Sequence, residues 1–217
     1  MSRKSNWTLH WLKSDFQINM SLKVGITGGI GAGKSLISGI FETFGIPVFN
    51  ADIEAKKLMN ENPVLITGMK KLFGQDIYQD GRLNRSLLAQ QLFADEHKRM
   101  KVNALVHPVV IDTYELWIKN QTHQPYSIKE AALLFEAGSY KDLDKIILVY
   151  APKKIRINRI LMRDAYRSTS DIESIIEKQW TDNQKKKLSD YIIINDEQQM
   201  VIPQVLDIHE KILKEIE

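Results

Sequence analysis

The residues with the clearest chemistry in this 217-residue chain form one short segment, Gly28–Ser35. Its order, Gly-Gly-Ile-Gly-Ala-Gly-Lys-Ser, fits the Gly-x4-Gly-Lys-Ser pattern of a P-loop. Such a backbone turns its N–H groups inward around a phosphate, and the next helix adds its unpaired N-terminal donors. Lys34 can place a charge on the β- and γ-phosphates, and the Ser35 hydroxyl can coordinate Mg²⁺. The segment predicts a nucleoside triphosphate site whose phosphate cradle is Gly28, Gly29, Ile30, Gly31, Ala32 and Gly33.

A second group of candidate residues is the basic segment 153–187, which holds ten Lys or Arg against five Asp or Glu. Within it, Arg156, Arg159 and Arg163 are spaced i, i+3, i+7 and so share one helical face. Such a face can carry arginines to a phosphate chain, and the alternative is a solvated helix surface. The chain as a whole carries a formal net charge of only +3.

The elements that must position these residues alternate between strands and helices. A buried strand, Leu22–Ile26, leads into the P-loop, and a helical pattern follows it. Further apolar segments predict strands within 45–49, 128–135, 145–150 and 191–194. This alternation predicts an α/β fold of the P-loop NTPase type, with a doubly wound five-stranded parallel sheet. Asp52 follows the second strand, which puts its carboxylate on the ligand side of such a sheet.

Between the second and third strands the pattern is helical and no strand-like alternation interrupts it. Asn62-Pro63, Asn84 and Asp95 have the residue types that cap helices, and Asp80-Gly81 marks a turn. We therefore expect a helical insertion in this stretch. Later helices are expected to begin near Pro152 and Ser170, and an amphipathic C-terminal helix is expected to end near Ile216.

Composition limits the classes of protein that fit. The chain has no cysteine, which excludes disulfides, thiolate metal sites and a cysteine nucleophile. No apolar run approaches the ~20 residues that a membrane span needs. Residues 1–19, with Trp7 and Trp11, precede a natural start at Met20. We interpret them as an N-terminal extension, for which a docking arm is the alternative.

Other P-loop classes fit less well than a small kinase. The chain lacks the Asp-x-x-Gly and Asn-Lys-x-Asp motifs of GTPases, and a motor ATPase needs a larger core. A kinase needs one insertion to hold the acceptor and a second to fold over ATP and exclude water. The helical stretch and the basic stretch fit these two tasks.

Motifs along the chain resemble those of the dephospho-CoA kinase family, in the order typical of it. They are Thr27–Ser35, Ala51-Asp52, His107-Pro108, Leu133–Glu136, the stretch from Arg159 to Asp164, and Asn195 after the last strand. The resemblance covers essentially everything from Leu22 onward. It implies transfer of the ATP γ-phosphoryl group to the ribose 3′-hydroxyl of dephospho-CoA, the last step of coenzyme A synthesis.

The resemblance also implies roles for acceptor-side residues. Asp52 resembles the family's catalytic base, and a carboxylate there can accept the 3′-hydroxyl proton. The alternative for Asp52 is an N-cap of the helix that begins near Ile53. His107 matches a His-Pro pair that begins a helix near the acceptor, or it is a buried structural histidine. Glu136 is expected at a strand end, where it orders Mg²⁺-bound water, binds the acceptor or makes a structural hydrogen bond.

On the donor side, Arg159 and Arg163 resemble lid arginines that stabilise charge on the transferring group. Asn195 resembles the family's adenine-side residues. The chain departs from the family pattern at Asn50, Lys56 and Ala132, which puts details of acceptor binding in doubt.

These observations predict an organisation in four parts. The core comprises 21–55, 119–152 and 187–217, the acceptor domain 56–118, the lid 153–186, and the extension 1–20. We expect a cytoplasmic monomer that uses ATP, Mg²⁺ and dephospho-CoA and engages neither nucleic acid nor membrane. The enzymatic alternative is another small-molecule kinase, such as a nucleoside monophosphate kinase. The non-enzymatic alternative is a nucleotide-gated nucleic-acid binder that uses the basic segment.

Overall fold

The central element of the computed structural model, which describes residues 21–121 and 123–216, is a parallel sheet. The sheet has five strands, as predicted, and their order is β2-β5-β1-β6-β7. Their bounds are β1 Leu22–Thr27, β2 Val48–Asn50, β5 Tyr126–Glu130, β6 Lys145–Tyr150 and β7 Tyr191–Ile194. The predicted extension, residues 1–20, lies outside the described residues.

The third predicted strand ends earlier in the chain than its apolar residues indicate. β5 ends at Glu130, although the apolar run continues to Phe135. Leu134 and Phe135 are buried in a small separate cluster with Ile146 and do not extend the strand. Glu136 is therefore six residues beyond the end of β5, and the expectation that it ends a strand is wrong.

One face of the sheet is covered by the helix after the P-loop, α1 (Lys34–Thr43), and by the C-terminal helix α9 (Val201–Ile216). Val205, Ile208 and Ile212 of α9 are spaced i, i+3, i+7, which forms the apolar stripe that packs on the sheet. The β6 residues Ile147 and Val149 point into this core. Burial of these residues holds the P-loop strand in the middle of a rigid layer.

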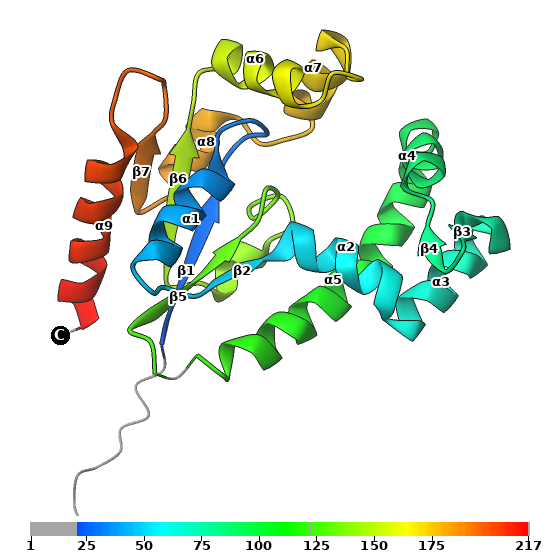
Figure 1. Cartoon of the computed structure of the whole chain (residues 1–217), viewed down its shortest axis with the longest axis horizontal. Coiled ribbons are helices and arrows are strands. Elements are labelled where there is room, and N and C mark those ends of the chain that lie inside the picture. Colours follow the sequence, from blue (N-terminus) through cyan, green and yellow to red (C-terminus); the bar gives the residue numbers. More distant parts are fainter. Residues whose placement is uncertain (1–20, 122, 217) are drawn as a thin grey trace, which may run out of the picture.

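The insertion between β2 and β5 forms a second apolar core beside the sheet (Figure 1). Its elements are α2 Ala51–Glu61, α3 Pro63–Phe73, η1 Gln75–Ile77, β3 Tyr78–Gln79, β4 Arg82–Leu83, α4 Arg85–Ala94 and α5 Glu96–Ile118. The caps predicted at Asn62, Asn84 and Asp95 are confirmed, since each side chain accepts from backbone N–H groups. The ribbon β3-β4 was not predicted, because two-residue strands are too short to show alternation.

The longest helix, α5, links the insertion to the sheet. Every fourth residue along it is buried, which gives a continuous apolar stripe: Val102, Val106, Val110, Tyr114 and Ile118. Pro108 lies inside this helix, so the expectation that His107-Pro108 begins a helix is wrong. Proline has no N–H to donate to the carbonyl four residues earlier, so this turn has one hydrogen bond fewer.

The basic segment forms three helices at the P-loop end of the sheet, with α6 and α7 beyond that end and α8 beside β6 (Figure 1). They are α6 Lys153–Arg163, α7 Thr169–Glu177 and α8 Asp182–Lys187, and a short irregular segment then leads into β7. Capping boxes at Ser168 with Asp171 and at Thr181 with Gln184 fix the starts of α7 and α8. Among the described helices, none combines the length and apolarity needed to cross a membrane.

Candidate active site

The P-loop has the backbone that its glycines predict. Gly31 and Gly33 have φ values of 79° and 95°, which side chains with a Cβ rarely adopt. A Cβ on Gly31 would approach the Arg156 carbonyl oxygen to 2.7 Å, and one on Gly33 would collide with the Asn195 amide. Gly33 also occupies the N-cap of α1, so the loop opens onto the N-terminal donors of that helix. The loop is thus shaped by α6 and by the end of β7 as well as by its own sequence.

Lys34 and Ser35 begin α1, and each already has a partner. The Lys34 ammonium donates to the Gly28 carbonyl at 3.2 Å, which folds the side chain back over the loop. Burial lowers the pKa of Lys34, while the carboxylates of Asp52 and Glu130 oppose that shift. The Ser35 hydroxyl donates to Glu130 at 2.9 Å. The two side chains lie together at the mouth of the loop, where a phosphate chain and a cation would meet.

Glu130 is a site residue that the sequence analysis missed. It ends β5, its residue partner on β1 is Ile26, and only 4% of its surface is exposed. The apolar run that predicts the third strand continues to Phe135, so Glu136 and not Glu130 was expected at the strand end. The usable signal was the Lys129-Glu130 pair interrupting that run, because charged residues are rarely buried without a partner.

A P-loop cavity of about 230 Å³ lies beneath α6, lined by Gly31, Gly33, Lys34, Ser35, Leu36, Arg159, Ile160 and Arg163. Arg163 is exposed and makes a two-pronged ion pair with Asp164, both distances being 2.9 Å. Arg159 donates to Asn195 at 3.2 Å and to Glu197 at 3.1 Å. The structure therefore brings both predicted arginines to the rim of this cavity.

Arg156, the third arginine on that helical face, is the most buried of the three. It is 4% exposed, its guanidinium lies against Gly29, and it pairs with Asp182 at 3.1 Å. Its Nε atom is buried without a hydrogen-bond partner. A fourth residue of the basic segment, Gln179, accepts a hydrogen bond from the Ile30 N–H at 3.0 Å. The basic segment thus rests directly on the P-loop.

Asn195 braces the P-loop from the end of β7. Its side-chain amide donates to the Ala32 carbonyl at 2.8 Å, and its backbone N–H donates to Tyr150 at 2.8 Å. The same side chain accepts from Arg159. Asn195 is only 7% exposed, so it fixes the loop and positions an arginine beside it.

Asp52 lies in the first turn of α2, where it is exposed. The side chain of Asn50, and not Asp52, caps this helix by accepting from the Ile53 N–H at 2.9 Å. Asp52 instead accepts weakly from the Ala132 N–H, at 3.4 Å. The structure therefore excludes the N-cap as the reason for an aspartate at this position.

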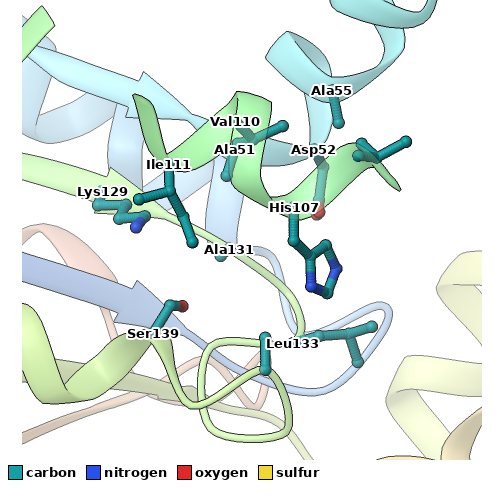
Figure 2. Close-up of a pocket in the computed structure, with 12 residues that line it drawn as sticks. Ala51, Asp52, Ala55, His107, Val110, Ile111, Lys129, Ala131, Leu133 and Ser139 are labelled. Carbon is teal, nitrogen blue, oxygen red and sulfur yellow. The ribbon is translucent and has the colours of Figure 1, made fainter. Parts of the chain in front are cut away.

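A second cavity, of about 130 Å³, lies between α2, α5 and the segment after β5 (Figure 2). The side chains around it come mostly from alanine, valine, isoleucine and leucine, and its polar members are Asp52, His107, Lys129 and Ser139. His107 lies beside Asp52 in the lining of the cavity (Figure 2). Burial lowers the pKa of its imidazole. Two predicted acceptor-side residues therefore share one pocket with two that were not predicted.

Glu136, the third predicted acceptor-side residue, lies elsewhere. It accepts from the Trp180 N–H at 2.7 Å and pairs with Lys185 at 3.1 Å. Lys185 is fully buried, and the Trp180 ring stacks on Phe135. Glu136 thus joins the segment after β5 to the basic segment.

The donor atoms near Ser35 fit a hard cation. In the described part of the chain no three Asp, Glu, His or Cys side chains gather as a metal cage. Mg²⁺ does not need such a cage, since it keeps several waters and binds one or two carboxylates together with substrate phosphates. The Ser35 hydroxyl and the Glu130 carboxylate supply oxygen ligands of that kind.

Comparisons with known proteins agree on one family. The dephospho-CoA kinase family model matches residues 22–200. The dephospho-CoA kinase of Bacteroides fragilis is 36% identical over 189 residues, covering 87% of this chain and 92% of that one. The enzyme of the same name from Porphyromonas gingivalis is 33% identical over 191 residues, covering 88% and 94%.

Solved structures share the fold. A crystal structure from Thermus thermophilus superposes with a TM-score of 0.75 at 27% identity, covering 91% of this chain and 98% of that one. The dephospho-CoA kinase of Campylobacter jejuni gives a TM-score of 0.65 at 23% identity, covering 89% and 98%.

Proposed function

The chain belongs to the dephospho-CoA kinase family of ATP-dependent phosphotransferases, and we propose that Lys34, Asp52 and the arginines of α6 carry its reaction. In that reaction the γ-phosphoryl group of ATP passes to the ribose 3′-hydroxyl of dephospho-CoA, giving CoA and ADP. The observation that carries the assignment of residues is the position of Asp52. It lines the cavity between α2 and α5, and its carboxylate is near enough to Lys34 to oppose the lowering of that lysine's pKa by burial.

The donor phosphates are proposed to occupy the P-loop cavity. Backbone N–H groups of Gly28 to Gly33 and the N-terminus of α1 would surround the β-phosphate. Lys34 would exchange its bond to the Gly28 carbonyl for the β- and γ-phosphates, since an ammonium prefers a charged acceptor. Asn195 supports this by holding the Ala32 carbonyl away from the phosphates.

Mg²⁺ is proposed to bind at Ser35 and Glu130. When bound, it would neutralise charge on the β- and γ-phosphates. We predict that Glu130→Gln, which keeps the acceptor for the Ser35 hydroxyl, raises the Mg²⁺ concentration for half-maximal rate by about 10–100-fold. Titration of activity with Mg²⁺ at saturating ATP measures this, with Glu61→Gln on the exposed surface of α2 as the matched control. An unchanged Mg²⁺ requirement would remove Glu130 from the site.

The acceptor is proposed to enter the cavity beside Asp52. The Asp52 carboxylate would accept the 3′-hydroxyl proton and hold that oxygen in line with the γ-phosphorus. Burial lowers the pKa of His107, which favours a neutral imidazole that can hydrogen-bond the ribose. We also propose that Glu136 contributes to acceptor binding, although its carboxylate is already paired with Lys185.

Charge that develops on the transferring group is proposed to be met by Arg159 and Arg163. Arg163 would first leave Asp164, and an exposed pair of this kind is held by only about 0–1 kcal/mol. The γ-phosphate therefore competes easily for it. Arg159 already lines the same cavity, where Asn195 and Glu197 hold it.

The test is a coupled ADP-release assay of the full chain with Mg²⁺-ATP and dephospho-CoA, with AMP and adenosine as competing acceptors. Strong preference for dephospho-CoA is the expected result. Transfer to AMP in its place would keep the donor site and overturn the acceptor. We further propose a cytoplasmic monomer, for which light scattering of the purified chain should give the mass of one 25.0 kDa chain.

A further inference from the structure

Lys129 is a buried cation to which the proposed reaction gives no role. It lies in the middle of β5, is 5% exposed, and lines the cavity that contains Asp52 and His107. Within residues 21–121 and 123–216 it has no hydrogen bond or ion pair, and its ammonium instead lies 4.3 Å from the centre of the Tyr114 ring. A lysine this buried almost always has a charged partner.

The surroundings of Lys129 explain why it has none within the protein. Asp142 and Glu115 act on it electrostatically, but both lie beyond ion-pair distance, and Glu115 is paired with Lys23. Burial outweighs these carboxylates and lowers the pKa of Lys129. Register explains the position, since Lys129 pairs with Phe49 of β2 and with Gly25 of β1. All three therefore face the side of the sheet that α5 covers, where the Phe49 ring also packs on Tyr114.

Lys129 and Asp52 are at opposite ends of the cavity in Figure 2, with the Lys129 nitrogen turned toward the space beside Ser139. The Ser139 hydroxyl donates to the Leu134 carbonyl, which leaves its oxygen free to accept. Between the two ends the walls are apolar side chains, among them Ala55, Val110 and Ile111. A water needs only about 10–15 Å³ of such space, so a cavity of about 130 Å³ accommodates a larger group.

We propose that Lys129 binds the adenine base of the acceptor nucleotide, donating a hydrogen bond to a ring nitrogen while Ser139 accepts from the adjacent exocyclic amine. The inference rests on the proposed function, because it requires the acceptor ribose at Asp52. An apolar slot with a few polar groups at one end is the usual form of a site for a planar ring. The base then fixes how far the ribose enters, and so where the 3′-hydroxyl meets Asp52.

The acceptor's diphosphate is the other group that an ammonium could bind, and the cavity fits it poorly. A diphosphate carries several charged oxygens, and burying any of them without a hydrogen-bond donor costs free energy. Apart from Lys129, the polar members of this pocket are an aspartate, a serine that already donates and a histidine at the other end. A base edge needs one donor and one acceptor, which is the pair that this end of the cavity supplies.

The test uses Lys129→Met, which keeps the length of the side chain and places an apolar group among apolar neighbours. We expect the KM for dephospho-CoA to rise about tenfold, the effect of losing one charge-assisted hydrogen bond, with the KM for ATP unchanged. Lys101→Met, on the exposed surface of the same α5 that lines the cavity, is the matched control. Thermal unfolding checks that the Lys129 variant is folded.

Analogues of the acceptor locate the contact. Dephospho-CoA with 1-deazaadenine or 7-deazaadenine lacks one of the two ring nitrogens that adjoin the amine. With one of the two analogues, the KM of the native enzyme should be about tenfold higher than with dephospho-CoA. With that same analogue, Lys129→Met should raise the KM no further. An unchanged KM for dephospho-CoA in Lys129→Met overturns the proposal. A tenfold rise in KM caused by Lys129→Met with both analogues also overturns it, because the ammonium then binds a group other than the base, such as the diphosphate. Absence of turnover of dephospho-CoA by the native enzyme overturns the proposed function, and this inference with it.

Discussion

The two ends of the proposed reaction path are built in different ways. The P-loop cavity is formed by the loop itself, the start of α1 and residues of α6, and side chains of Asn195 and Gln179 hold the loop backbone in place. The cavity beside Asp52 is formed from side chains of α2, α5 and β5. Phosphate is the same in every nucleotide, so one backbone shape serves it. An acceptor differs between kinases, and side chains can be exchanged without changing the loop.

Removal of the Lys34 charge should have the largest effect on the reaction. Lys34→Ala is expected to lower kcat by at least about 10³-fold, because the cation on the transferring phosphate is lost. The coupled ADP-release assay measures it, and Lys71→Ala in α3 is the control. Turnover at the native rate would contradict the P-loop mechanism. Binding of dephospho-CoA, measured by calorimetry, should be unaffected, which separates the two ends of the path.

Asp52→Asn tests the acceptor end and should have the next largest effect. We expect kcat to fall by about 10²–10⁴-fold, the range for a general base, with nearly unchanged affinity for ATP. The Asn50 cap of α2 remains in this variant, so the helix should keep its stability. A loss of ATP affinity in place of kcat would make Asp52 a donor-site residue and break the distinction between the two ends.

The contrast between the two ends also explains what the sequence could predict. The P-loop was predicted because its eight residues are contiguous and their types are dictated by backbone geometry. Glu130 was missed because it reaches Ser35 only through strand pairing across 95 residues of chain. Lys129 was missed because a buried lysine inside an apolar strand has no local pattern. Its environment comes from α5, Phe49 and the segment that contains Ser139.

Helix caps were predicted better than the position of a proline within a helix. Asn62, Asn84 and Asp95 were identified as caps from residue type alone. His107-Pro108 was expected to begin a helix, since it resembles a His-Pro pair that does so in the family. The helix continues through it because the stripe from Val102 to Ile118 is buried on both sides of the proline. Packing along this stripe, over about four and a half turns, outweighs one missing hydrogen bond.

The pair of Glu136 and Lys185, where the segment after β5 meets the basic segment, should affect stability and not the rate of the reaction. Glu136→Leu should destabilise the fold by about 3–5 kcal/mol, because it leaves a fully buried ammonium without its partner. Glu136→Leu with Lys185→Met should recover most of that loss, since two apolar groups then replace the pair. Urea unfolding measures both. Recovery of stability with a native KM for dephospho-CoA would contradict the prediction that Glu136 binds the acceptor.

The smallest effect concerns His209, which is remote from both ends. Its Nδ1 lies 2.6 Å from the Tyr126 hydroxyl, and burial lowers its pKa, although Glu210 opposes this. A histidine with a lowered pKa binds fewer protons in the folded state than in the unfolded state. Stability from this group is therefore complete above pH of about 6.5 and is lost as the pH falls below that value. Melting temperatures of the native chain between pH 7.5 and 5 measure the loss.

His209→Gln separates this contribution from every other titrating group, His107 included. Glutamine can keep a hydrogen bond to Tyr126 but does not titrate, so the variant should lose less stability than the native chain over the same pH range. The kcat should be equal in both, because α9 packs on the face of the sheet opposite the acceptor cavity. Equal pH dependence in the two proteins would show that protonation of His209 is not resisted by the fold. A drop in kcat would show that a change at the Tyr126 contact shifts Lys129 and Glu130, which lie further along the same strand. The site and α9 would then be coupled, although they lie on opposite faces of the sheet.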